Sequence, residues 1–91
     1  MINRDDLLKK IQVERERQFN LPGSEFDIKN TPNDWISIIG HYTNRDVFRS
    51  GRKPLKDEFE DSLIKAAAVI LAALEHSENM KTKGHFVNDD E

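Results

Sequence analysis

The segment LIKAAAVILAAL, residues 63–74, decides the fold because Lys65 is its only polar residue and the run is long enough for a helix. Apolar side chains would point in almost every direction around that helix, whereas a surface helix carries them along one stripe. Such a helix must be covered on several sides. Five alanines would let neighbouring helices approach closely: Ala66, Ala67, Ala68, Ala72 and Ala73.

The rest of the chain offers little to cover this helix. Two shorter helical segments precede it, and a chain of 91 residues buries only about 60–65% of the surface that its unfolded form exposes. A second copy of the chain would supply the missing cover. We therefore predict an all-α, three-helix chain, with two shorter helices and one long apolar helix, that assembles as a helical bundle in a homo-oligomer. The dimer is the simplest closed form.

Start and stop signals define the two shorter helices. Asn3 is a good N-cap residue for the first helix, which the Leu-Pro-Gly turn at residues 21–23 ends. Thr31 and Pro32 read as the N-cap and first residue of the second helix. Helical spacing in the first helix links Leu7, Leu8, Ile11, Arg15 and Phe19, and the face of the second carries Trp35, Ile38, Ile39 and Tyr42, widened by Ile36.

The remaining segments read as connections. The linker at residues 20–31 is rich in turn-forming residues, and we expect Phe26 and Ile28 to anchor it. Residues 1–76 form one helical domain. Beyond it the pattern loses its periodicity, so residues 77–91 are predicted to be a flexible acidic tail.

Composition excludes several classes of protein. There is no Cys, so neither a disulfide framework nor a Cys-based zinc site can form, and a reducing cytoplasm is the expected location. The net charge of −3 argues against a nucleic-acid partner held by phosphate contacts. The longest apolar run, residues 66–74, is far shorter than the roughly 20 residues that span a bilayer, so we expect no membrane association.

Three segments, in this order, resemble the small phage and prophage members of the MazG-like, all-α nucleotide pyrophosphohydrolase superfamily. They are ERERQ at residues 14–18, DWISIIG at residues 34–40 and LIKAAAVILAALE at residues 63–75. The resemblance covers residues 11–75. It implies an oligomeric helical bundle that cleaves nucleoside triphosphates to the monophosphate and pyrophosphate. It also implies that one Arg of the first segment points into the bundle.

In that family a Glu-x-x-Glu on one helix and a Glu-x-x-Asp on the next hold Mg²⁺. A spacing of three places two carboxylates on one helix face, and this hard cation needs several oxygen ligands. Here His41, Tyr42 and Arg45 stand at the positions of the first acids, and Ser62 and Lys65 at those of the second pair. We therefore expect a non-catalytic relative that needs no cofactor.

The leading hypothesis is a protein that binds a nucleotide or nucleotide-derived ligand at an oligomer interface. Its predicted ligand residues are His41, Tyr42, Arg45, Arg49 and Lys65. Arg presents a planar fork that matches phosphate oxygens, and an aromatic ring can stack on a base. The less specific interpretation is that Tyr42, like Trp35, belongs to the core.

Two alternatives stay open. The chain could be a small interaction module, or an inhibitor of a host protein, that uses the surface of the long helix and the acidic tail. It could also be a Mg²⁺-dependent pyrophosphohydrolase, because Glu58 and Asp61 keep the Glu-x-x-Asp spacing one turn earlier.

Charge and histidine patterns give weaker signals. Residues 45–56 carry five cations, which would either bind phosphate or pair with the acids at residues 57–61. His41, His76 and His85 lack a mutual spacing typical of a zinc site.

Overall fold

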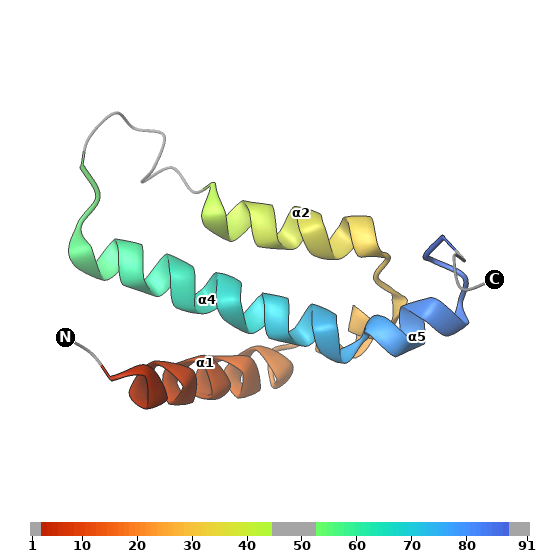
Figure 1. Ribbon diagram of the computed structural model, residues 1–91, viewed down its shortest axis with the longest axis horizontal. Helices are drawn as coiled ribbons and strands as arrows, with labels where there is room; N and C mark the ends of the chain where they lie inside the picture. The colour runs from red at the N-terminus through yellow and green to blue at the C-terminus, as the bar shows by residue number, and fades with distance from the viewer. Residues whose placement is uncertain (1–2, 45–52, 88–91) are drawn as a thin grey trace.

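The computed structural model describes residues 3–44 and 53–87. Within these two ranges all regular secondary structure is helical, so the predicted all-α class is confirmed. In chain order the elements are α1 (Arg4–Phe19), the 3-10 helix η1 (Ser24–Lys29), α2 (Pro32–Thr43), α4 (Lys56–Glu75) and α5 (Ser77–Thr82). Helix α4 is central, with α1 packed on one side and α2 on the other (Figure 1).

Helix α1 begins and ends where its local signals predict. The Oδ1 atom of Asn3 accepts a hydrogen bond from the backbone N–H of Asp5 at 2.6 Å, which satisfies one of the unpaired donors of the first turn. After the helix, Gly23 has a φ of 97°, a left-handed conformation that glycine adopts without steric cost. This turn leads the chain into η1.

The linker is held differently from the prediction. The side chains of Phe26 and Ile28 are half exposed, so they are not the expected anchors. Instead, the carbonyl oxygen of Ile28 accepts hydrogen bonds from Asn79 Nδ2 at 3.0 Å and from Lys83 Nζ at 2.8 Å. The last carbonyls of a short helix lack partners within it, so donors from α5 and the residue after it can bind them.

Helix α2 starts with a complete capping box. Thr31 Oγ1 accepts from the Asp34 N–H at 3.2 Å, and Asp34 Oδ2 accepts from the Thr31 N–H at 2.9 Å. Trp35 is only 4% exposed and lies at the centre of the core. The prediction that Ile36 widens the inner face is wrong, because its side chain is 67% exposed. The core side of α2 consists of Trp35, Ile38, Ile39 and Tyr42.

Helix α4 buries small residues and leaves large ones half exposed. Ser62, Ala66, Ala68, Val69 and Ala72 are buried, whereas much of Leu63, Ile70 and Leu74 remains accessible. Within this chain, α1 and α2 therefore cover only part of the apolar segment. Among the described residues no helix has the length and apolar character that crossing a bilayer requires.

The helical domain continues beyond the predicted boundary at residue 76. Ser77–Thr82 form α5, and Met80 is 4% exposed in a cluster with Trp35, Val69 and Ala72. The start of the predicted flexible tail is therefore wrong. Periodicity over one and a half helical turns is too short to read from sequence, whereas the packing of Met80 is a tertiary contact.

Candidate functional site

The structure describes three of the five predicted ligand residues, because Arg45 and Arg49 lie outside the described residues. His41 is exposed and Tyr42 partly buried near the end of α2, with ring centroids 5.4 Å apart in an edge-on arrangement. Lys65 lies in the middle of α4. The ERERQ segment of α1 lies near two of these positions, because Arg17 interacts electrostatically with Tyr42 and Gln18 Nε2 donates to the carbonyl oxygen of Lys65.

Five side chains form a polar cluster between α1 and α4. Arg17 binds Glu14 with both ends of its guanidinium, Nε to Oε1 at 2.8 Å and Nη2 to Oε2 at 2.6 Å. Gln18 Nε2 donates to Glu14 Oε2 at 3.0 Å and to the carbonyl oxygen of Lys65 at 3.4 Å. Lys65 Nζ lies 3.0 Å from Asp61 Oδ2. These five residues are called the polar cluster below: Glu14, Arg17, Gln18, Asp61 and Lys65.

Electrostatics in the polar cluster favours its ionised state. The hydrogen bond from Arg17 holds the pKa of Glu14 below its ordinary value, with smaller contributions from Gln18 and from the charge of Lys65. The same bond raises the pKa of Arg17, and the nearby Tyr42 and Asp61 add to that effect. Both partners therefore stay charged and paired at neutral pH.

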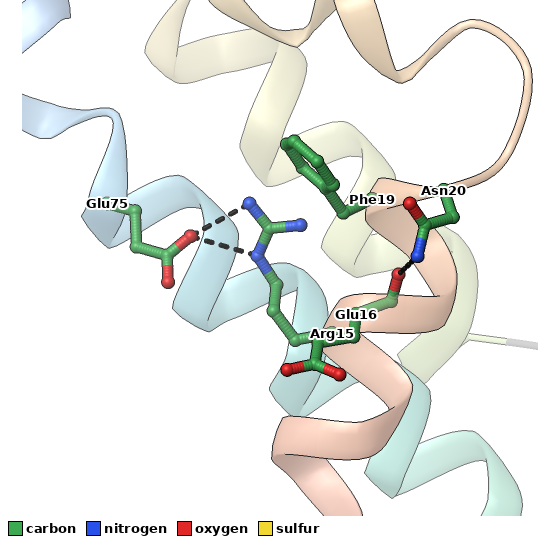
Figure 2. A pocket seen from close by; sticks show the side chains of 5 residues that line it. All are labelled: Arg15, Glu16, Phe19, Asn20 and Glu75. Carbon is green, nitrogen blue, oxygen red and sulfur yellow. Dashed lines mark hydrogen bonds and ion pairs between the residues drawn. The ribbon is translucent and has the colours of Figure 1, made fainter.

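Arg15, not Arg17, is the arginine that points toward the bundle. Its side chain is 12% exposed, and Nε and Nη2 lie 2.9 Å and 2.8 Å from Glu75 Oε1 at the end of α4 (Figure 2). Its guanidinium carbon also lies 5.6 Å from the ring centroid of Phe19. The surrounding cavity of about 420 Å³ is lined by Arg15, Glu16, Phe19, Asn20 and Glu75.

A smaller cavity of about 210 Å³ lies between α1, α2, α4 and the linker. Arg15, Gln18, Trp35 and Tyr42 contribute polar groups to its lining, and Val69 contributes apolar surface. The Nε1 atom of Trp35 is buried and has no hydrogen-bond partner among the described residues. The Trp35 ring stacks on the ring of His76. The ring centroids are 5.5 Å apart, and the angle between the ring planes is 24°.

A groove of about 760 Å³ runs between α1 and the first half of α4 and is acidic. Its charged lining consists of five carboxylates and two lysines, which gives a net charge of −3: Asp6, Glu14, Asp57, Glu60, Asp61, Lys9 and Lys10.

Glu58 and Asp61, the metal ligands expected if the chain were an enzyme, bind other groups of the protein. Glu58 Oε1 accepts from the Leu55 N–H at 3.1 Å and so caps α4, and Asp61 pairs with Lys65. In the described ranges no three His, Asp or Glu side chains gather where they could hold a metal ion.

One cation of the basic segment at residues 45–56 pairs with an acid of residues 57–61, which is the second of its two interpretations. Lys56 Nζ lies 2.9 Å from Glu60 Oε2, so this cation pairs with the acids that follow it. The three histidines lie at the end of α2, directly after α4 and after α5. The Nδ1 atom of His85 is buried and finds no hydrogen-bond partner within residues 3–44 and 53–87.

Sequence reasoning missed the roles of Arg15, Gln18 and Glu75. The signal for Arg15 was available, since it shares the apolar spacing of Leu8 and Ile11 on α1. Gln18 and Glu75 gave no comparable signal, because their partners lie 47 and 60 residues away in the chain.

Comparison with known proteins gives no match: no family model, no curated protein and no solved structure corresponds to this chain.

Proposed function

We propose that this chain is a non-catalytic MazG-like protein of the small phage or prophage type. It binds a nucleotide or nucleotide-derived ligand at the interface of a homo-oligomer. The main support for this proposal comes from two ion pairs in the polar cluster, Glu14 with Arg17 and Asp61 with Lys65. Mg²⁺ needs several oxygen ligands, and here protein cations occupy these two carboxylates. The arrangement supports binding rather than metal-dependent hydrolysis.

Residues suited to the two parts of a nucleotide follow one another in the chain. The rings of His41 and Tyr42 lie at the end of α2, where an exposed imidazole can stack on a base. Arg45 and Arg49 follow in sequence, and a guanidinium can donate two parallel hydrogen bonds to a phosphate. Lys65 is a secondary contact in this proposal, because Asp61 already binds it.

Self-association is supported by the small size of the core. Among the described residues, the buried hydrophobic set is Trp35, Ala66, Ala68, Val69, Ala72 and Met80, of which three are alanines. Many larger apolar side chains stay exposed in the single chain. Burial of apolar surface is the main source of protein stability, so covering these side chains with a second copy would be favourable. Light scattering on a sizing column should therefore give a dimer or larger species, and a monomer at micromolar concentration would contradict this part.

Calorimetry tests the ligand. Nucleoside triphosphates, monophosphates and cyclic dinucleotides are titrated into the wild type, into Arg45→Ala and into the control Arg4→Ala. Losing a charge-assisted hydrogen bond costs about 1.5–3 kcal/mol, so Arg45→Ala should weaken binding at least about tenfold. Arg4→Ala should bind like the wild type. Absence of binding heat with every compound would reject the ligand.

Release of pyrophosphate tests the enzyme alternative. Incubation with each nucleoside triphosphate and Mg²⁺ should give no turnover. Turnover that disappears in Asp61→Asn, but persists in Asp27→Asn, would replace this proposal with the enzyme.

The second candidate function is an interaction module for a host protein. The acidic groove between α1 and α4 favours it, because its lining has a net charge of −3 around Val13 and Ile64, which suits a basic segment of a partner. Affinity capture from host lysate should then retain one stoichiometric partner on the wild type and lose it on a variant with Asp57→Asn and Glu60→Gln. Capture of no such partner by the wild type would reject this function.

A further inference from the structure

One face of α4 carries large apolar side chains that the rest of the chain leaves partly accessible. Leu63, Ile70 and Leu74 are 43%, 42% and 65% exposed, and Phe59 is 46% exposed at the N-terminal end of the same face. The intervals are four, seven and four residues, so these side chains lie within about 60° of one another around a helix of 3.6 residues per turn. These four residues form the α4 stripe.

The α4 stripe points away from both neighbours of α4. Helix α1 contacts α4 through the Gln18 bond to the Lys65 carbonyl and through Glu75, and α2 packs Trp35 against Val69. Around the helix these α4 positions lie at least about 100° from the centre of the stripe. The stripe is about 22 Å long at 1.5 Å per residue. A continuous exposed apolar surface of this kind marks an interaction site.

We infer that the α4 stripe binds the α4 stripe of a second copy in antiparallel orientation. This pairing rests on the self-association in the proposed function, and it specifies the interface and its symmetry. The positions are symmetric in the sequence: Phe59 and Leu74 have the same midpoint as Leu63 and Ile70. That midpoint lies between Ala66 and Ala67.

A two-fold axis through this midpoint makes the stripe complementary to itself. Phe59 of one copy then meets Leu74 of the other, and Leu63 meets Ile70. Ala67, the small residue on this face between the two large pairs, lies at the axis, where the helices can approach closely. The spacing suits a second copy as the occupant, because the two-fold axis places each large side chain of the stripe opposite another large one.

Charge selects the antiparallel orientation. The first turns of α4 carry four acids, at residues 57, 58, 60 and 61, against Lys56 and Lys65, so residues 56–65 have a net charge of −2. In a parallel pair the two acidic segments would lie about 10 Å apart, the usual distance between packed helices. In the antiparallel pair equivalent acids are separated by at least about 16 Å along the helix axis, which still exceeds the Debye length of about 8–10 Å at physiological salt. Repulsion between the acids is therefore largely screened only in the antiparallel pair.

Disulfide crosslinking tests the pairing in the full chain, which has no native Cys. The variant with both Leu63→Cys and Ile70→Cys should form disulfide-linked dimers under mild oxidation. Each single variant should not, because identical positions lie about 10 Å apart along the axis and a disulfide needs Cα atoms within about 7 Å. The same limit prevents a bond between the two positions within one chain.

The outcomes separate the pairing from the proposal on which it rests. A monomer by light scattering at micromolar concentration would overturn both the pairing and the proposed self-association. A dimer whose single Cys variants crosslink, or whose double variant does not, would overturn the pairing alone. Nucleotide binding is measured separately by calorimetry.

A charge placed in the stripe gives a second readout. Leu63→Glu should raise the dissociation constant of the dimer at least about tenfold, which corresponds to about 1.4 kcal/mol. Ile36→Glu is the matched control, because Ile36 is an equally apolar, exposed residue on α2 outside the stripe. Circular dichroism should show native helicity for both variants. Equal dissociation constants for Leu63→Glu and Ile36→Glu would reject the α4 stripe as the interface.

Discussion

The guanidinium of Arg15 binds the carboxylate of Glu75, a residue 60 positions later in the chain, through two donors at 2.9 Å and 2.8 Å. This contact fixes the C-terminal half of α1 against the last turn of α4 (Figure 2). Arg15 is nearly buried and Glu75 half exposed, so solvent screens the pair only from one side. The contact therefore contributes to stability, although less than a fully buried pair would.

Glu75→Gln should lower the free energy of unfolding by about 0.5–1 kcal/mol, the upper range for a partly exposed ion pair. Urea unfolding at low salt measures it. At about 1 M salt, where the Debye length is about 3 Å, the loss should shrink. The control Glu78→Gln, an exposed acid on α5, should change little at either salt concentration. Equal losses for both variants would contradict a specific role of the Arg15 contact.

Met80→Ala should destabilise the protein by about 2–3 kcal/mol, because it removes a buried side chain and leaves a cavity beside Trp35. Thermal or urea unfolding measures the loss. Val87→Ala is the matched control, since Val87 is 87% exposed and should stay within about 0.5 kcal/mol of the wild type. If Met80→Ala behaved like the control, α5 would not belong to the domain.

Thr31→Ala should cost about 1 kcal/mol, because it removes one half of the capping box at the start of α2. Ser37→Ala, at an exposed position inside the same helix, provides the comparison and should be nearly neutral. Denaturant midpoints at pH 7 give both values. A neutral Thr31→Ala would show that tertiary packing alone sets the start of α2.

Glu14 makes stability depend on pH. A carboxyl group whose pKa is lowered in the folded state adds stability above its ordinary pKa of 4.5, and this contribution is lost as the pH falls through the lowered value. Glu14→Gln removes that titration. The melting temperature of the wild type should therefore fall more steeply than that of Glu14→Gln between about pH 5 and about pH 3.

Glu16→Gln is the control for this pH profile, because it keeps Glu14 and its bond to Arg17. Its melting temperature should fall with pH as steeply as that of the wild type. A Glu14→Gln profile parallel to the wild type would show that the Arg17 bond does not contribute to acid sensitivity.

Local sequence signals predicted the starts of α1 and α2 because the capping partners lie close in the chain. Asn3 binds the N–H of a residue two positions later, and Thr31 and Asp34 bind each other across one turn. Such bonds form in any context in which the helix forms, so the capping rules apply directly to the sequence.

Side-chain direction around each helix was less predictable. Sequence spacing assigned Trp35 correctly to the core but also assigned Ile36 to it, because both lie on a broad apolar arc. Only the position of α4 decides which part of that arc is buried. Spacing placed Arg15 on the face of Leu8 and Ile11, but it could not reveal its partner Glu75, which lies 60 residues away in the chain.

The candidate site was predictable only in part. The choice of His41, Tyr42 and Lys65 as ligand residues stays a prediction. The neighbours of Tyr42 and Lys65 on α1, Arg17 and Gln18, became visible only in the fold. The pairing of Lys65 with Asp61 was open to prediction at a spacing of four, whereas the Gln18 bond to the Lys65 carbonyl was not.

The sequence by itself determined that the chain is helical, where its first helices begin, and that the segment at residues 63–74 forms the central element. These properties follow from propensity, capping and periodicity, which act over a few residues. The tertiary structure decided that α5 belongs to the core through Met80, which arginine crosses to α4, and which face of α4 stays accessible. Contacts between segments far apart in the chain depend on how whole helices pack, and no local pattern encodes that geometry.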